Sequence, residues 1–174
     1  IDGRISIKNL SFSYIPDQEV IHGIDLEIKP GEKIAIVGAT GAGKSTLINL
    51  LSRFYDFEKG SIHLDNYSIK EFTLKSLRKH VGIVLQDVFL FADTIYNNIT
   101  LFTPDVKPET VYEAARQIGV HRFIESLPGG YDYNVKERGV MLSSGQRQLI
   151  SFLRVYISDP SVLILDEATS SIDS

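Results

Sequence analysis

The run Gly38–Thr46 constrains the fold of this chain more than any other stretch. It matches G-x-x-x-x-G-K-[ST], a P-loop whose glycines let backbone N–H groups surround a polyphosphate. Such a loop joins a strand to a helix, and the sequence predicts both. Lys33–Val37 is apolar without alternation, typical of a strand buried on both faces, and Leu47, Ile48, Leu50 and Leu51 lie at helical spacing. The sequence therefore predicts an α/β fold with a parallel sheet and a nucleotide bound at this loop.

The loop also contains the first candidate ligands. Lys44 supplies a positive charge for the β- and γ-phosphates, and the Ser45 hydroxyl can ligate Mg²⁺. The N-terminus of the following helix adds partial positive charge. The residues expected to bind the phosphates of ATP are Gly38, Thr40, Gly41, Ala42, Gly43, Lys44, Ser45 and Thr46.

Composition narrows the class of protein. The 174 residues are 43% hydrophobic and 23% charged, as expected for one soluble globular domain. A net charge of −4 argues against a nucleic-acid surface, and no apolar stretch is long enough to span a membrane. The absence of cysteine excludes disulfides and thiolate chemistry. Because the chain starts at Ile1 and stops at Ser174 in a polar run, we expect it to be a piece of a longer polypeptide.

Alternating apolar residues predict the strands. Residues 4–30 are expected to form antiparallel strands, and 60–66 another short strand and turn. Val81–Leu85 and Val162–Leu165 are short apolar runs that predict two more buried strands.

Between these last two strands the pattern becomes helical. Pro108 suits the first turn of a helix that ends at Gly119, and residues 122–127 predict a short helix. Ser143 or Ser144 could cap a longer helix through Ser158, which is apolar nearly all round and therefore expected to be buried.

Three polar residues follow the predicted core strands. Gln86 comes after one strand, and Asp166 and Glu167 come after another. In open parallel sheets, ligands bind at the carboxyl ends of strands, so these side chains could meet the ATP held by the P-loop. Asp166 could hold Mg²⁺ opposite Ser45, and Glu167 could deprotonate the attacking water. The alternative is that the acidic pair caps the next helix, and a lone Gln after a strand carries no information.

The run Leu142–Gln146 is a second small-residue loop that opens a helix. Exposed N–H groups and a serine hydroxyl there could accept an anion. Unlike the P-loop, this loop has no lysine, and it lies in the helical insert. Two phosphate-binding loops on one small chain suggest that one of them serves a neighbouring molecule.

In this order, the P-loop, Gln86, the signature run Leu142–Gln146 and the Walker B run Val162–Glu167 resemble the motifs of the nucleotide-binding domain of ABC transporters. The resemblance covers nearly the whole chain. Gln86–Phe91, followed by Thr94–Ile99, is similar to the exporter Q-loop segment, and Tyr133–Gly139 is similar to the exporter X-loop, whose end Glu137–Gly139 resembles most closely.

The resemblance implies a P-loop NTPase with a RecA-like parallel core, an antiparallel β-subdomain and an inserted α-helical subdomain. The single domain 1–174 would divide into a β-subdomain (1–30 and 60–75), a P-loop core (31–59, 80–86 and 160–174) and a helical subdomain (88–158).

It also implies residue roles. Tyr14 would stack on adenine, although a strand-end aromatic in a core is the alternative. Gln86 would sense Mg²⁺, Asp166 would support it, and Glu167 would be the catalytic base. The residues that would complete the ATP site of a partner domain, head to tail, are Ser143, Ser144, Gly145 and Gln146. The D-loop Ser171–Asp173 would run along that interface, and Phe89–Phe91 would line a groove for a coupling helix, with ordinary core packing as the alternative.

The implied function is ATP binding and hydrolysis that power export across a membrane. The partners would be a second ABC ATP-binding domain, identical or paralogous, and a transmembrane domain attached through coupling helices, with no nucleic acid. The transporter would place this soluble domain at the cytoplasmic face of the cell's inner membrane. The alternatives are a regulatory ATP-binding domain without turnover and a non-transport ABC ATPase of DNA repair or translation. The transported substrate is not encoded in this chain.

The sequence departs from the family pattern at several positions. Ser144 stands where the signature has glycine, and Asn134 replaces an acidic residue of the X-loop. The family's switch histidine lies beyond Walker B, whereas His22, His63, His80 and His121 all precede Asp166. We therefore expect this chain alone to bind ATP but to hydrolyse it poorly.

Overall fold

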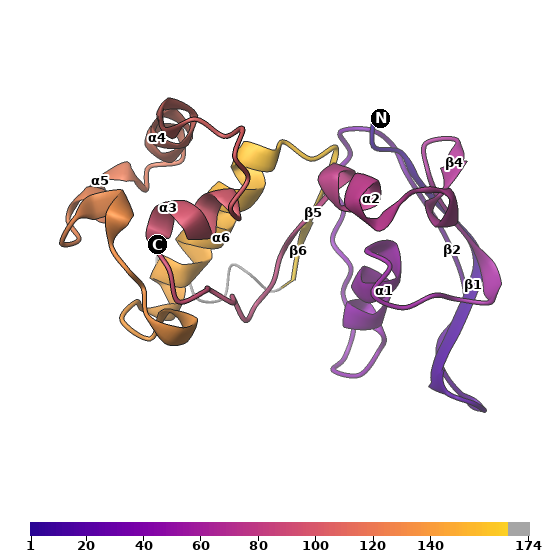
Figure 1. Ribbon diagram of the computed structural model, residues 1–174. Coiled ribbons are helices and arrows are strands. Elements are labelled where there is room, and N and C mark those ends of the chain that lie inside the picture. Colours follow the sequence, from indigo (N-terminus) through magenta and orange to yellow (C-terminus); the bar gives the residue numbers. More distant parts are fainter. Residues whose placement is uncertain (167–174) are drawn as a thin grey trace. The chain divides into compact units, whose positions relative to one another are not determined.

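The structure is a computed structural model that describes residues 1–166. The chain forms two compact units, of which the first ends at Gly82 and the second begins at Ile83. Figure 1 shows the elements of both units in chain order. Each unit is described separately below.

The first unit is built on a four-stranded antiparallel sheet of order β2-β1-β3-β4. The strands are β1 (Ile5–Ile15), β2 (Gln18–Ile28), β3 (Lys59–Leu64) and β4 (Tyr67–Ser68). Side chains of alternate residues, including Ile5, Ile7, Ile62 and Leu64, are buried on one face of the sheet. The antiparallel strands predicted over 4–30 and 60–66 are therefore confirmed.

Gly60 allows β3 to lie close to a bulge in β1. The register between β1 and β3 shifts between Lys8 and Ser11. Gly60 has φ +87°, and a Cβ atom there would lie 2.4 Å from the carbonyl oxygen of Asn9. Only glycine fits both the backbone conformation and this close approach.

Three short helices accompany the sheet: α1 (Lys44–Leu51), η1 (Ile69–Glu71) and α2 (Leu74–His80). The side chains of Leu47, Leu50 and Leu51 on α1 are buried, which confirms the helix predicted after the P-loop. Thr73 caps α2, since its hydroxyl accepts a hydrogen bond from the backbone N–H of Ser76 (3.1 Å).

The strand predicted at Lys33–Val37 is not present in the structure. These residues are irregular, and Ile34, Ile36 and Val37 are 43%, 47% and 88% exposed. Apolar composition gives a segment the capacity to be a strand, but a strand also needs a neighbour to pair its backbone N–H and C=O groups. The four strands of this unit pair in the order β2-β1-β3-β4, and none of them pairs with residues 33–37.

The second unit combines a small sheet with a group of helices. The strands β5 (Val81–Val84) and β6 (Val162–Leu165) form a two-stranded sheet and run in the same direction (Figure 1). The helices are α3 (Ile95–Thr100), α4 (Pro108–Gln117), α5 (His121–Glu125), η2 (Gly130–Asp132), η3 (Glu137–Gly139) and α6 (Ser144–Ser158).

The helices share one apolar core. It contains Leu90, Ile95, Ile99, Val111, Ala115, Val120, Ile124, Val135, Leu142, Ile150 and Leu153. The helix predicted from Pro108 is confirmed, with Pro108 in its first turn and Gly119 just beyond its end at φ +81°. The short helix predicted at 122–127 is α5, and the capped helix through Ser158 is α6.

Two burial predictions in this unit are wrong. Along β6, half-buried and exposed side chains alternate, and Leu163 and Leu165 are 54% and 46% exposed. This alternation arises because one face of the two-stranded sheet is uncovered. On α6, Tyr156 is 48% exposed although the helix looked apolar all round. Strand β5 ends at Val84, so Leu85 lies just outside it.

Candidate functional site

Within the P-loop, a glycine with left-handed backbone conformation lies at the start of α1. Gly43 is the N-cap residue of α1, with φ 92°. A Cβ atom there would lie 2.8 Å from Cδ1 of Ile21 and 3.1 Å from the carbonyl oxygen of Val20 on β2. Glycine at this position therefore satisfies both the turn and the packing of the loop against the sheet.

Lys44 folds over the loop that precedes it. Its Nζ atom donates to the carbonyl oxygens of Gly38 (2.6 Å) and Ala39 (3.0 Å). Residues 38–42 and Ser45 are exposed. The ammonium charge, the N-terminus of α1 and the exposed loop together form a surface suited to a polyphosphate.

Tyr14 lies at the end of β1 against the same helix. Its hydroxyl donates to Oγ1 of Thr46 (3.1 Å) and accepts from Nδ2 of Asn49 (3.4 Å). The ring packs edge-on against Phe12 and Tyr55, with centroids 4.9 and 5.0 Å apart. Because Tyr14 remains 43% exposed, it is not a core aromatic, and the structure leaves ring surface for a base to stack on.

In the second unit, Gln86 and Asp166 reach the same edge of the small sheet. The backbone N–H of Asp166 donates to the carbonyl of Val84 (3.0 Å), which continues the pairing of β5 and β6 to their carboxyl ends. Gln86 follows Val84 by two residues and is exposed, and Asp166 is half-buried. Carboxylate and carboxamide oxygens are the donors that Mg²⁺ prefers, so the residue types fit this ion. Within residues 1–166, no cluster of three or more His, Cys, Asp or Glu side chains could hold a metal by itself.

The predicted catalytic base Glu167 and the D-loop Ser171–Asp173 lie outside the described residues. Their roles therefore stay predictions.

The signature loop ends in a capping box at the start of α6. The Ser143 hydroxyl accepts from the backbone N–H of Gln146 (3.1 Å), and Oε1 of Gln146 accepts from the backbone N–H of Ser143 (2.9 Å). Leu142 is buried in the helical core, whereas Ser143 and Ser144 are exposed. The loop is thus anchored on its inner side and presents two serines and a helix N-terminus to solvent.

The segment 133–139 that leads to the signature lies beside the segment that follows Gln86. The backbone N–H of Val135 donates to the carbonyl of Asp93 (3.0 Å), and that of Ile95 donates to the carbonyl of Tyr133 (2.9 Å). Asn134, which departs from the family pattern, uses its Oδ1 atom to accept from the N–H of Lys136 (2.9 Å). The hydrogen bond of the Asn134 side chain therefore stays within its own segment.

Asp93 also stabilises the start of α3. Its carboxylate accepts from the backbone N–H of Thr94 (2.6 Å) and from Nδ2 of Asn97 (2.7 Å). These bonds hold the pKa of the Asp93 carboxyl below its usual value, the Thr94 N–H having the largest effect.

Sequence reasoning missed Asn98, which fastens the segment after Gln86 to α3. Asn98 is fully buried; its Oδ1 accepts from the N–H of Phe91 (2.8 Å), and its Nδ2 donates to the carbonyls of Phe91 and Thr94 (both 3.0 Å). The signal was present, because an asparagine beside Ile99 on the inner face of a short helix must find internal partners.

Two polar residues of α6, the half-buried Arg154 and the buried Gln148, have buried side-chain atoms without a hydrogen-bond partner among the described residues. Arg154 donates through Nε to the carbonyl of Asn98 (2.9 Å), and burial lowers the pKa of its guanidinium. Gln148 is 1% exposed, and neither Oε1 nor Nε2 has a hydrogen-bond partner among the described residues.

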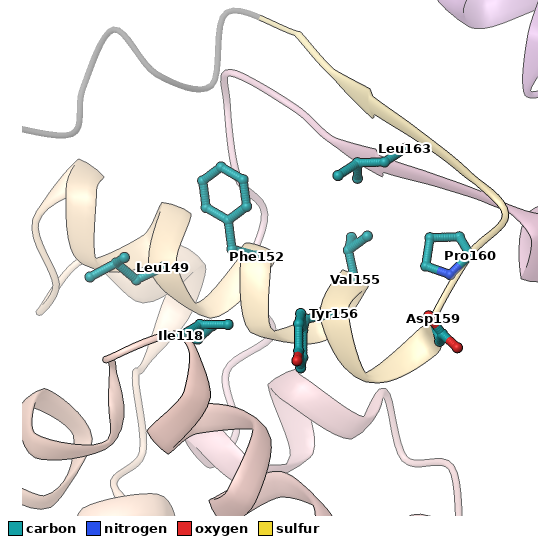
Figure 2. Close-up of a pocket in the computed structure, with 8 residues that line it drawn as sticks. All are labelled: Ile118, Leu149, Phe152, Val155, Tyr156, Asp159, Pro160 and Leu163. Atoms are coloured by element: carbon teal, nitrogen blue, oxygen red, sulfur yellow. The ribbon is translucent and has the colours of Figure 1, made fainter. Parts of the chain in front are cut away.

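An apolar cleft of about 380 Å³ lies between α6, β6 and the end of α4 (Figure 2). Figure 2 shows Phe152, Val155 and Leu163 around it, with Asp159 at one end. The lining offers no convergent set of polar groups and hence no catalytic chemistry.

Comparison with known proteins identifies the family of this chain. The family described as ABC transporter matches residues 21–170. YgaD of Bacillus subtilis (strain 168), named as a multidrug export ATP-binding/permease protein, is 47% identical over 174 residues, which cover 99% of this chain and 30% of YgaD. A Staphylococcus aureus (strain NCTC 8325) protein described in the same words is 49% identical over 172 residues, again 98% of this chain and 30% of the relative.

Among solved structures, a bacterial Atm1-family ABC exporter with ATP bound matches with a TM-score of 0.94 and 41% identity. The match covers 99% of this chain and 30% of that one. This chain belongs to the ABC transporter family. It corresponds to the exporter-type ATP-binding domain, a domain class that binds ATP and acts as an ATPase, and the predicted fold class is confirmed.

The chain spans about 30% of the length of the relatives it matches. No helix within residues 1–166 has the length and apolar character needed to cross a membrane.

Proposed function

We propose that this chain binds MgATP between its P-loop and a partner's signature loop and hydrolyses it to drive export by an attached membrane domain. The observation that carries the proposal is the surface at the start of α1: Lys44 lies over the exposed loop at its N-terminus, and Tyr14 of β1 is hydrogen-bonded to Thr46, two residues after Lys44. A cation for the phosphates and a ring for the base thus lie against the same helix.

The remaining polar residues have roles consistent with phosphoryl transfer to water. Lys44 would neutralise charge that develops on the γ-phosphate. Ser45 of the first unit and Gln86 and Asp166 of the second are the residues that would hold Mg²⁺, which would supply further charge neutralisation. Glu167 takes the proton of the attacking water. The exposed Ser143–Gln146 loop would bind the γ-phosphate held by a second domain.

The membrane partner would dock on the segment after Gln86. Phe89 and Phe91 are 56% and 44% exposed, and their rings pack edge to face at 5.1 Å. Exposed neighbouring aromatics are typical of a protein-contact surface. The relatives combine ATP-binding and permease segments, which supports a coupling helix as the occupant and the cytoplasmic face of a membrane as the location.

Measurement of ATP affinity tests the proposal. Lys44→Ala removes the only side-chain cation of the P-loop, so ATP binding by this chain should weaken by at least about tenfold. The matched control is Lys75→Ala, which removes an exposed lysine from α2 and should leave ATP affinity unchanged. Equal ATP affinity of the wild-type chain and Lys44→Ala would contradict the proposed site.

A further inference from the structure

The hydroxyl of Tyr14 is tied to the P-loop helix on two sides. It accepts from Nδ2 of Asn49 (3.4 Å) and donates to Oγ1 of Thr46 (3.1 Å). Thr46 is only 6% exposed and Asn49 is half-buried, so the tie runs along α1 beneath the exposed face of the Tyr14 ring. Stacking on adenine requires only the ring and leaves these hydrogen bonds without a function.

The direction of the hydrogen bonds follows from their chemistry. An amide Nδ2 can only donate, so the Tyr14 oxygen accepts from Asn49 and its own hydrogen points to Thr46. Thr46 then uses an acceptor lone pair for Tyr14, and its hydroxyl hydrogen is left to donate elsewhere. Thr46 lies at the end of the P-loop motif, in the first turn of α1.

We infer that Asn49, Tyr14 and Thr46 form a hydrogen-bond relay that orients the Thr46 hydroxyl as a donor to a phosphate of the bound nucleotide. Tyr14 is then a positioning residue for the phosphate end of ATP as well as a platform for its base. Successive hydrogen bonds polarise one another, which strengthens the last donor toward an anion. This inference rests on the proposed function of the same site.

Inorganic tripolyphosphate separates the two roles because it has no base to stack. Tyr14→Phe keeps the ring and removes the hydroxyl. If the relay operates, this variant should bind tripolyphosphate and ATP more weakly than wild type by the same factor, about three- to tenfold, the effect of losing one hydrogen bond between neutral groups. A Tyr14 that acts only through its ring would leave the affinity for tripolyphosphate unchanged in Tyr14→Phe, and that result would overturn the inference.

Asn49→Leu provides a second, independent break in the relay. It should weaken tripolyphosphate binding less than Tyr14→Phe, and adding it to Tyr14→Phe should cause little further loss, because both changes interrupt the same relay. Fully additive losses would contradict a relay. This variant also keeps the test valid if Tyr14→Phe lowers the stability of the first unit.

Tyr55→Phe is the matched control. Tyr55 is 47% exposed, packs against Tyr14 and loses the same atom in the variant, but the hydrogen bonds to Thr46 and Asn49 come from Tyr14, so tripolyphosphate affinity should not change. The two hypotheses fail differently. If wild type binds tripolyphosphate and Lys44→Ala does not, but Tyr14→Phe binds as wild type does, only the relay is wrong. If wild type binds neither tripolyphosphate nor ATP, the proposed function fails as well.

Discussion

At the scale of single residues, the structure satisfies most buried polar groups but leaves Gln148 without partners. Asn98, equally buried, makes three hydrogen bonds through its carboxamide, whereas the described residues offer none to Gln148. A buried polar group without a partner costs about 1–3 kcal/mol. Gln148 is therefore retained at a cost to stability that an apolar side chain of similar size would avoid.

Gln148→Leu should accordingly raise the free energy of unfolding by about 1–3 kcal/mol, since it removes two unpaired atoms and keeps most of the packing volume. Urea unfolding followed by circular dichroism measures the change. Asn98→Leu is the matched control and should destabilise the chain, because it leaves the backbone groups of Phe91 and Thr94 unpaired. A less stable Gln148→Leu variant would show that the carboxamide has partners after all.

Sequence motifs predicted candidate ATP-binding residues by type and spacing, but not the contacts that these residues make with one another. Lys44, Ser45 and Thr46 follow from one local pattern. The bond from Tyr14 to Thr46 joins residues 32 positions apart, and the bond from Arg154 to Asn98 joins residues 56 apart. Such pairs depend on how β1 packs on α1, or α6 on α3, and no single window of sequence contains that information.

At the scale of elements, the sequence predicted an element correctly where neighbouring residues in the chain stabilise it. Pro108 and Ser143 mark the starts of α4 and α6 because first-turn and capping chemistry involves only neighbouring residues. The apolar run Lys33–Val37 failed as a strand prediction, since a strand is completed only by a neighbour that pairs with it. The burial of β6 was overestimated for a related reason: the strand pairs with β5, but burial also depends on what covers each face of the sheet.

The capping box of α6 allows a quantitative test at this scale. Ser143→Ala removes the acceptor of the Gln146 N–H and should lower the free energy of unfolding by about 1 kcal/mol. Ser144→Ala is the matched control: the same atom is removed one residue later, at an exposed position outside the box, so stability should change by less than about 0.5 kcal/mol. Thermal or urea denaturation of the two variants measures the difference, and equal effects would assign the cap to Ser144 instead.

At the scale of the whole molecule, the two loops proposed to bind phosphate differ in the charged groups they carry. The P-loop has Lys44, whereas the signature loop has only serines and a helix N-terminus. If each ATP is held by the P-loop of one chain and the signature of another, a chain defective in one loop can still supply the other. The head-to-tail arrangement can therefore be tested by mixing two different defective chains.

Lys44→Ala disables the P-loop and leaves the signature intact. Ser144→Glu does the opposite: an acidic residue in the first turn favours α6 but repels the phosphate of the partner's ATP. With MgATP, each variant alone should remain monomeric. An equimolar mixture should form dimers, since one of its two sites combines the intact P-loop of the Ser144→Glu chain with the intact signature of the Lys44→Ala chain.

Sedimentation velocity of wild type, of each variant and of the mixture reads out this complementation. Wild type should dimerise most and the mixture to an intermediate extent, because the mixed dimer has one complete site where the wild-type dimer has two. If the signature served the ATP of its own chain, both variants would lack every complete site and mixing would restore nothing. A mixture that stays monomeric while wild type dimerises would therefore refute the head-to-tail assignment of Ser143–Gln146.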